Sequence, residues 1–293
     1  MKGVLLAGGN GTRLSPVTIT TSKHLLNIYD KPMIYYSLAT LLLAGAEEIF
    51  IVSREQDALS YERLLKPLET LGLRYQIVVQ EKPLGIVDGI SAVGRKLKIP
   101  TDLLVVLGDN LFFGQGMGRG LSDVFSTDMA SIFLQSVDNP SAYGIATLRG
   151  DRVMSLDEKP THTQSNLAVC GLYYFPKDAV EKAQKLELSE RGELEVTDLL
   201  RIFLQEGRLT ANRLERGTAW LDMGTVEDFY EASAFVAAIQ NRQGQLVNSP
   251  EEALLTTSLC SKAELQEYLK SRPNNPYYQK LRLLASEKKS PDN

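Results

Sequence analysis

The chain has 293 residues, a formal net charge of −4 and an apolar content of 43%. This length suffices for one large domain, or for a main domain with a small appendage, and the weakly acidic balance excludes a general nucleic-acid-binding face. It has two cysteines, two histidines, no C-x-x-C spacing, no run of about twenty apolar residues and no N-terminal signal-peptide core, so we expect a soluble cytoplasmic protein without a zinc cluster or a membrane span.

About the first hundred residues alternate apolar runs with segments of helical periodicity, which is the pattern of βαβ units. The expected strands are 4–7, 48–53, 74–79 and 103–107, and the expected helices between them are 33–44, 57–65 and 86–97. The apolar runs at 49–52 and 103–107 indicate strands that are covered on both faces. We therefore predict an α/β fold with a largely parallel sheet flanked by helices.

A glycine-rich segment follows the first expected strand, where residues 4–14 read VLLAGGNGTRL. Gly8, Gly9 and Gly11 would let backbone N–H groups approach a phosphate chain, with Thr12 at the end of the turn. Arg13 adds a planar guanidinium that suits phosphate oxygens. The spacing matches neither G-x-G-x-x-G nor a P-loop, which argues against an NAD-dependent oxidoreductase. The turn predicts a nucleotide site, and a plain strand-to-loop bend is the alternative.

After Pro140 the chain changes to shorter strands and a few helices. The expected strands are 145–149, 153–158, 168–175 and 209–214, and the expected helices are 178–185, 195–205 and 226–243. From Pro250 to about Leu284 we expect short helices separated by prolines, and we expect the polar residues 286–293 to fray.

Three strings occur in order near the N-terminus: G-G-x-G-T-R-L, then S-K-H-L-L with Lys23, then D-K-P-M-I. Together they resemble the sugar nucleotidyltransferases, above all their thymidylyltransferase branch, and the resemblance runs from Met1 to about Ser258. It implies a Rossmann-like, GT-A-like mixed sheet with a small helical C-terminal appendage. It also implies a catalytic domain at 1–245, with a nucleotide-binding half (1–115) and a sugar-phosphate-binding half (116–245), and a C-terminal helical segment at 246–293.

The activity implied by the resemblance is transfer of a nucleotidyl group from a nucleoside triphosphate to a sugar 1-phosphate, with release of pyrophosphate. The implied cofactor is Mg²⁺, and the implied assembly is a homodimer or homotetramer. In this reaction Arg13 and Lys23 would neutralise the triphosphate and help pyrophosphate to depart. A sugar 1-phosphate is already an anionic nucleophile, so positioning and charge stabilisation would suffice without a general base.

Two aspartates follow apolar stretches, Asp109 in VVLGDN and Asp222 in AWLDMGT. A carboxylate placed behind such a stretch is partly desolvated and favours a cation. The resemblance implies that these two aspartates hold Mg²⁺ and that Asp109 borders the nucleotide. A local turn role is the alternative for either residue.

The string LDEKP is the candidate acceptor site, in which Lys159 would hold the sugar 1-phosphate and Glu158 would accept hydrogen bonds from sugar hydroxyls. By the same resemblance, Gly144 and Val169 contact the sugar, and Arg191 in RGELEVTD approaches its phosphate. Arg191 could equally be a salt-bridge residue at the start of a helix.

Gln80, Pro83 and Gly85 are the candidates for the base pocket, because a side-chain amide offers both a donor and an acceptor to a pyrimidine edge. Residues 84–89 read LGIVDG, whereas thymidylyltransferases usually show a polar residue and then Gly-Leu-Ala-Gln-Ala. The base therefore stays open: dTTP is expected first, with UTP or CTP as competitors.

Three other positions depart from the family pattern: His24 replaces a glutamine, and Cys170 and Met223 each replace a threonine. We expect Cys170 and Met223 to leave the acceptor pocket short of hydrogen-bond donors, so that the acceptor is glucose 1-phosphate or a modified relative. The family's second, regulatory nucleotide-sugar site has a counterpart in SPEE at 249–252, but Thr256 and Phe113 stand where an arginine and a tyrosine are usual.

A catalytically silent nucleotide-sugar sensor on the same fold is the alternative from another class. It would be indicated by loss of Arg13, Lys23, Asp109 or Asp222, and all four are present. The sequence therefore favours the enzyme.

Overall fold

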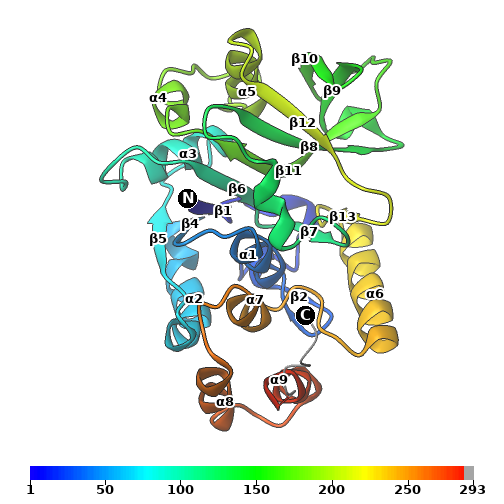
Figure 1. Ribbon diagram of the computed structural model, residues 1–293. Coiled ribbons are helices and arrows are strands. Elements are labelled where there is room, and N and C mark those ends of the chain that lie inside the picture. Colours follow the sequence, from blue (N-terminus) through cyan, green and yellow to red (C-terminus); the bar gives the residue numbers. More distant parts are fainter. Residues whose placement is uncertain (287–293) are drawn as a thin grey trace.

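A mixed β-sheet crosses the computed structural model, which describes residues 1–286 (Figure 1). Along this range the strand order is β10-β9-β11-β6-β1-β4-β5, with β8 paired to β11 and to β12. Residues 287–293, most of the segment expected to fray, lie outside the described residues. The predicted α/β class with a mixed sheet flanked by helices is confirmed.

The centre of the sheet is parallel. β1 (Lys2–Leu6) lies between β4 (Ile49–Ser53) and β6 (Leu103–Leu107), and β5 (Tyr75–Val79) extends the parallel set at the edge. These strands read as apolar runs because helices cover both of their faces. All four lie where the sequence predicts strands, although β1 begins and ends earlier than expected.

Helices form a layer on each face of the sheet, as Figure 1 shows. On one side lie α3 (Ile86–Gly94), α4 (Ala179–Ala183) and α5 (Val196–Gln205). On the other lie α1 (Ile34–Leu43), α2 (Glu55–Leu65) and α7 (Pro250–Thr256). Successive strand residues serve the two layers in turn, as the strand period of two requires. Val4 therefore packs on the α3 side and Leu5 on the α1 side.

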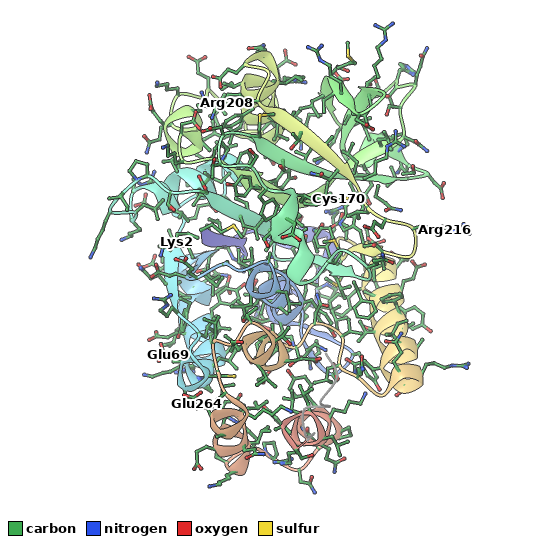
Figure 2. All side chains as sticks on the ribbon, in the orientation of Figure 1. Lys2, Glu69, Cys170, Arg208, Arg216 and Glu264 are labelled. Atoms are coloured by element: carbon green, nitrogen blue, oxygen red, sulfur yellow. The ribbon has the colours of Figure 1, made fainter. Side chains whose placement is uncertain are left out.

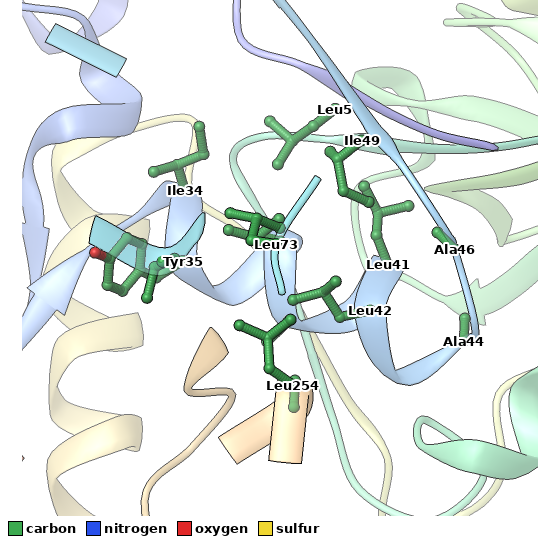
Figure 3. Close-up of a cluster of buried hydrophobic side chains, with 14 of the residues drawn as sticks. Leu5, Ile34, Tyr35, Leu41, Leu42, Ala44, Ala46, Ile49, Leu73 and Leu254 are labelled. Atoms are coloured by element: carbon green, nitrogen blue, oxygen red, sulfur yellow. The ribbon is translucent and has the colours of Figure 1, made fainter. Parts of the chain in front are cut away.

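The C-terminal helices share the main core. In Figure 3, Leu5 and Ile49 of the sheet lie beside Leu41 of α1, and Leu254 of α7 approaches the same cluster from the far side. α8 (Lys262–Lys270) and α9 (Pro276–Ser286) continue this layer away from the sheet (Figure 1). The domain boundary near residue 245 stays a prediction.

The second half of the chain adds mostly antiparallel strands to the β6 edge. These are β8 (Ala130–Ser136), β9 (Gly144–Arg149), β10 (Arg152–Glu158), β11 (Leu167–Phe175) and β12 (Leu209–Arg213). β11 runs antiparallel to β6, β8 and β9, whereas β12 is parallel to β8. β8 was not predicted, although its apolar run at 130–134 is typical of a strand covered on both faces.

Two small ribbons also lie outside the predicted strands: β2 (Asn27–Ile28) with β3 (Lys31–Pro32), and β7 (Asn110–Phe113) with β13 (Ala219–Asp222). The β7–β13 pair joins segments that are distant in the sequence, so no local pattern announces it. It is followed by α6 (Val226–Gln243), whose start carries a capping box between Thr225 and Asp228. Within residues 1–286, each helix is too short or too polar to span a lipid bilayer.

Candidate functional site

Two adjoining cavities open at the carboxyl ends of β1 and β6, where ligands collect in open α/β sheets. The glycine-loop cavity has a volume of about 320 Å³, and the central cavity has a volume of about 490 Å³. Ile86, Leu107, Asp109 and Glu193 border both. The glycine-loop cavity is further lined by Gly8, Gly9, Asn10, Lys23, His24, Gln80, Pro83 and Gly85. The central cavity is further lined by Arg13, Tyr143, Gly144, Glu158, Lys159, Val169, Arg191, Thr197, Trp220 and Asp222.

The glycine turn forms one wall of the first cavity. Gly8 and Gly9 line this cavity. Gly11 and Thr12, which were also predicted to bind the nucleotide, line neither cavity. Gly11 has φ 63° and ψ 28°, the left-handed region that favours glycine, and it leads into the 3-10 helix η1 (Thr12–Leu14). A Cβ on Gly8 would lie 2.8 Å from Oε1 of Gln80. The turn therefore depends on glycine both for its conformation and for its close contact with Gln80.

Arg13 reaches into the central cavity from η1. Its guanidinium lies against Gly224, so closely that a Cβ there would be 3.0 Å from one terminal nitrogen. This contact holds an exposed cation near Asp222. Arg13 therefore lines the central cavity, whereas Gly8 and Gly9 of the same turn line the glycine-loop cavity.

Lys23 and Asp109 form an ion pair between the two cavities. Lys23 begins the 3-10 helix η2 (Lys23–Leu25), and Asp109 follows β6. Burial by itself would raise the pKa of Asp109, but the charge of Lys23, the neighbouring His24 and the hydrogen bonds from Lys23 and Asn110 together outweigh burial and hold this pKa below its usual value. Asp109 is therefore an anion at neutral pH.

His24 is 2% exposed and lies beneath this pair. Its Nδ1 is 3.0 Å from Oγ of Ser22, which in turn is 2.8 Å from the hydroxyl of Tyr61. Burial and the neighbouring Lys23 lower the pKa of His24 to about 3. The ring is consequently neutral at physiological pH and cannot share the phosphate-binding charge of Lys23.

Asp109 and Asp222 meet through the buried amide of Asn110. Nδ2 of Asn110 donates to Oδ1 of Asp109 at 2.9 Å and to Oδ1 of Asp222 at 3.5 Å. The indole N–H of Trp220 donates to Oδ1 of Asn110 at 2.5 Å, which fixes the orientation of the amide. Burial and the negative charge of Asp109 raise the pKa of Asp222 to about 7.

This raised pKa indicates that burial and the charge of Asp109 disfavour the ionised form of Asp222 more than Lys23 and Arg13 favour it. The oxygens of the two carboxylates are the ligands that Mg²⁺ prefers, and Mg²⁺ is commonly held by one or two carboxylates together with substrate phosphates. Within residues 1–286, no group of three or more His, Cys, Asp or Glu side chains is placed to hold a metal. The donor set fits an ion that is shared with a substrate phosphate.

The acceptor side of the central cavity is organised around Glu158. Its Oε2 accepts a hydrogen bond from Oγ1 of Thr197 at 2.5 Å, and its Oε1 accepts one from Arg191 at 3.2 Å. A Cβ on Gly144 would lie 3.2 Å from Oε2, so a glycine leaves this carboxylate room. Lys159 adopts φ 42° and donates its backbone N–H to the carbonyl of Tyr143 at 3.0 Å.

The positive φ of Lys159 is uncommon for a residue other than glycine and clusters at functional sites in other proteins. Val169 reaches the same cavity from β11, so all five residues predicted to bind the sugar phosphate line one cavity. Arg191 also pairs with Glu195 at 3.3 Å, next to the start of α5, so the predicted salt-bridge role coexists with its place in the cavity.

Comparison with protein families identifies the chain. The model of the family described as nucleotidyl transferase matches residues 2–239. The chain belongs to the nucleotidyltransferase family.

The nucleotidyltransferase is similar to curated glucose-1-phosphate thymidylyltransferases over most of its length. It is 42% identical to that of Mycobacterium tuberculosis over 253 residues, which cover 86% of this chain and 88% of the relative. It is 40% identical to that of Neisseria meningitidis over 283 residues, which cover 96% and 98%.

Solved structures agree with the fold. A Bacillus anthracis protein assigned as a glucose-1-phosphate thymidylyltransferase and solved with sucrose has a TM-score of 0.74 and 32% identity, covering 80% of this chain and 94% of that one. A UDP-glucose pyrophosphorylase solved with UDP-glucose has a TM-score of 0.72 and 25% identity, covering 82% and 99%.

Two sequence-based expectations about the acceptor pocket of this nucleotidyltransferase are wrong. Cys170 and Met223 are both 0% exposed and line neither cavity. Along β11, Val169 and Gly171 face the central cavity, so the intervening Cys170 faces the other side of the sheet. There it belongs to the same hydrophobic core as Leu5, and Figure 2 labels it in the interior of the protein. Met223 packs with Ile28 in the core beside α6. These residues do not remove hydrogen-bond donors from the pocket.

Sequence reasoning missed three site residues of the nucleotidyltransferase: Asn110, Thr197 and Trp220. Asn110 directly follows Asp109 in VVLGDN, and this position was the available signal. Thr197 lies within RGELEVTD, the string that begins with Arg191, and only the fold brings its hydroxyl to Glu158. The expected regulatory segment at 249–252 is the start of α7, where Ser249 accepts a hydrogen bond from the backbone N–H of Glu252. Its regulatory role stays a prediction.

Proposed function

We propose that the protein transfers a thymidylyl group from dTTP to glucose 1-phosphate, giving dTDP-glucose and pyrophosphate. The observation that carries this proposal is the meeting of two cavities at Asp109: a glycine-walled cavity suited to a nucleotide, and a second cavity lined by Glu158, Lys159 and Arg191. The relatives named glucose-1-phosphate thymidylyltransferase support the choice of substrates.

The triphosphate would bind first, with its base toward Gln80 and its phosphates along Gly8 and Gly9. Lys159 would then hold the 1-phosphate of the sugar, and Glu158 would accept hydrogen bonds from sugar hydroxyls. Thr197 and Arg191 hold the carboxylate of Glu158 in place for this role.

A phosphate oxygen of the sugar 1-phosphate would attack the α-phosphorus in line, and the bond from this phosphorus to pyrophosphate would break. Arg13 and Lys23 would stabilise the charge on the departing pyrophosphate. Asp109 and Asp222 are the residues that would hold Mg²⁺, and a bound Mg²⁺ supplies further neutralisation of phosphate charge. No side chain needs to act as a general base, because the attacking oxygen is already ionised.

A matrix of nucleoside triphosphates against sugar 1-phosphates, read as pyrophosphate release, tests the proposal. We expect the fastest release with dTTP and glucose 1-phosphate, and faster release with UTP, CTP or a modified sugar phosphate would replace that substrate pair. Binding of nucleotide sugars without pyrophosphate release from any pair would instead identify a sensor.

Asp109→Asn supplies the matching variant. We expect its turnover to fall by at least about 100-fold, because catalysis here depends on placed charge. Asp151→Asn, in the exposed turn between β9 and β10, is the control and should keep its turnover. Near-normal turnover of Asp109→Asn would remove this residue from the site. The cytoplasmic location and the homodimeric or homotetrameric state stay predictions.

A further inference from the structure

The side chain of Gln80 is a fixed part of the glycine-loop cavity. Gln80 directly follows β5, and its backbone N–H donates to the carbonyl of Ser53 at 2.9 Å. Its side chain is 8% exposed and lines the cavity together with Gly8. Its Oε1 points at Gly8, where a Cβ would lie 2.8 Å away. The amide therefore has little freedom to move away from this wall.

Asp88 determines which end of this amide faces the cavity. It lies in the first turn of α3, and its Oδ2 accepts a hydrogen bond from Nε2 of Gln80 at 2.5 Å. The carbonyl oxygen of Gly85 accepts from the same Nε2 at 3.5 Å. A carboxylate and a carbonyl can only accept, so a reversed amide would place its oxygen against two other oxygens. Nε2 is held toward Asp88, and Oε1 is left for the cavity.

We propose that Asp88 is a specificity-positioning residue, which makes the cavity present a hydrogen-bond acceptor to the base of the nucleotide. This inference rests on the proposed function, since it assumes that the base lies in the glycine-loop cavity. Thymine and uracil carry an N3–H that can donate to Oε1 of Gln80. The N3 of cytosine has a lone pair instead, so that two acceptors would face each other.

The cavity would therefore select a base by its N3–H group and not by the methyl group of thymine. A site that hydrogen-bonds a donor discriminates strongly against an analogue that lacks it, because its own polar group is then left unpaired. We therefore expect wild-type protein to bind dTTP and UTP with similar affinity, and CTP at least about tenfold more weakly.

Direct binding of dTTP, UTP and CTP to the intact protein tests this role. Titration calorimetry with Mg²⁺ and without a sugar phosphate measures each affinity before any chemistry. The variant is Asp88→Asn, because an asparagine can offer Gln80 either a donor or an acceptor and so permits both amide orientations. Its control is Glu81→Gln, which removes the same charge from an exposed neighbour outside the cavity wall.

We expect the ratio of the CTP to the dTTP dissociation constant to fall by about tenfold in Asp88→Asn and to stay unchanged in Glu81→Gln. A purely structural role of Asp88 would weaken all three nucleotides together and leave the ratio constant, which would overturn the inference. If Asp88→Asn does not fold, Asp88→Gln provides the same ambiguity of donor and acceptor.

The wild-type titrations separate this inference from the proposed function. Equal binding of dTTP and CTP, or tighter binding of CTP, would overturn the role of Asp88 while leaving a nucleotidyltransferase. Failure to bind any of the three nucleotides would overturn the proposed function itself.

Discussion

Lys23 and Asp109 are paired at the junction of the two cavities, although 86 positions separate them in the chain. Their side chains are 11% and 14% exposed. Asp109 compensates the desolvated ammonium and thereby holds it beside both the glycine turn and the central cavity. The pair is a structural element of the site as well as a source of charge.

Lys23→Met should therefore cost stability in addition to turnover. Removing one partner of a buried pair leaves the other charge uncompensated, at a cost of about 3 kcal/mol in the free energy of unfolding. Urea denaturation should detect this loss, and adding Asp109→Asn to Lys23→Met should recover most of it. Lys98→Met removes an exposed lysine and serves as the control. Equal stability of the two single lysine variants would show that the pair contributes nothing to the fold.

The sequence predicts much of this site because its glycines and charged residues follow short apolar runs that indicate strands. Gly8, Arg13 and Asp109 all stand at or just after the ends of such runs, and the fold brings these ends to one edge of the sheet. Lys23 was predicted from its string alone, and the ion pair with Asp109 was not foreseen. A contact between segments so far apart leaves no local pattern.

The errors have two physical origins. Cys170 was assigned to the wrong side of its strand, although strand alternation with Val169 could have excluded it. The Trp220–Asn110 and Thr197–Glu158 hydrogen bonds join elements that only the tertiary fold brings together. Reading such pairs from the sequence would require knowing the sheet order first.

The pKa of Asp222 predicts that the free energy of unfolding depends on pH when a chelator keeps metal ions away from the site. The folded-state pKa of about 7 exceeds the ordinary value of 3.8, so the folded protein binds this proton more tightly than the unfolded chain. Stability is therefore lost as the pH rises from about 4 to 7, at about 1.4 kcal/mol per unit and about 4 kcal/mol in all.

Asp222→Asn does not titrate and should avoid this loss. In urea denaturation with a chelator present, the free energy of unfolding of the variant should rise relative to that of the wild type between pH 4.5 and pH 8. Adding Mg²⁺ and a nucleotide should reduce this difference. A constant difference across this range would mean that Asp222 carries no uncompensated charge in the folded protein.

The pKa of His24 predicts the opposite pH dependence of the free energy of unfolding. Its folded-state pKa of about 3 lies below the ordinary value of 6.5, so its contribution is present above pH 6.5 and is lost as the pH falls toward 3. At pH 4.5 the loss is about 3 kcal/mol, at about 1.4 kcal/mol per unit.

His24→Gln should remove this acid sensitivity, so that its unfolding free energy falls less than that of the wild type between pH 7 and pH 4.5. His162→Gln replaces the other histidine, which is exposed, and should follow the wild type. Parallel pH profiles for His24→Gln and the wild type would contradict the neutral, buried state of the ring.

Gly224→Ala should slow turnover by displacing Arg13. The new Cβ would lie 3.0 Å from a terminal nitrogen and 3.2 Å from the central carbon of the guanidinium, at the free end of a flexible side chain. The guanidinium should move and the backbone should not, so we expect a stability change below about 1 kcal/mol and a turnover loss of about tenfold to 100-fold. Steady-state pyrophosphate release and thermal unfolding measure the two effects.

Gly120→Ala is the matched control, because a Cβ there meets only a carboxylate oxygen of Asp123, at 3.8 Å. If Gly224 acts through Arg13, Arg13→Ala combined with Gly224→Ala should be no slower than Arg13→Ala alone, since the displaced group is already absent. Multiplying losses in the double variant would mean that Gly224 serves the reaction by a route other than the position of Arg13.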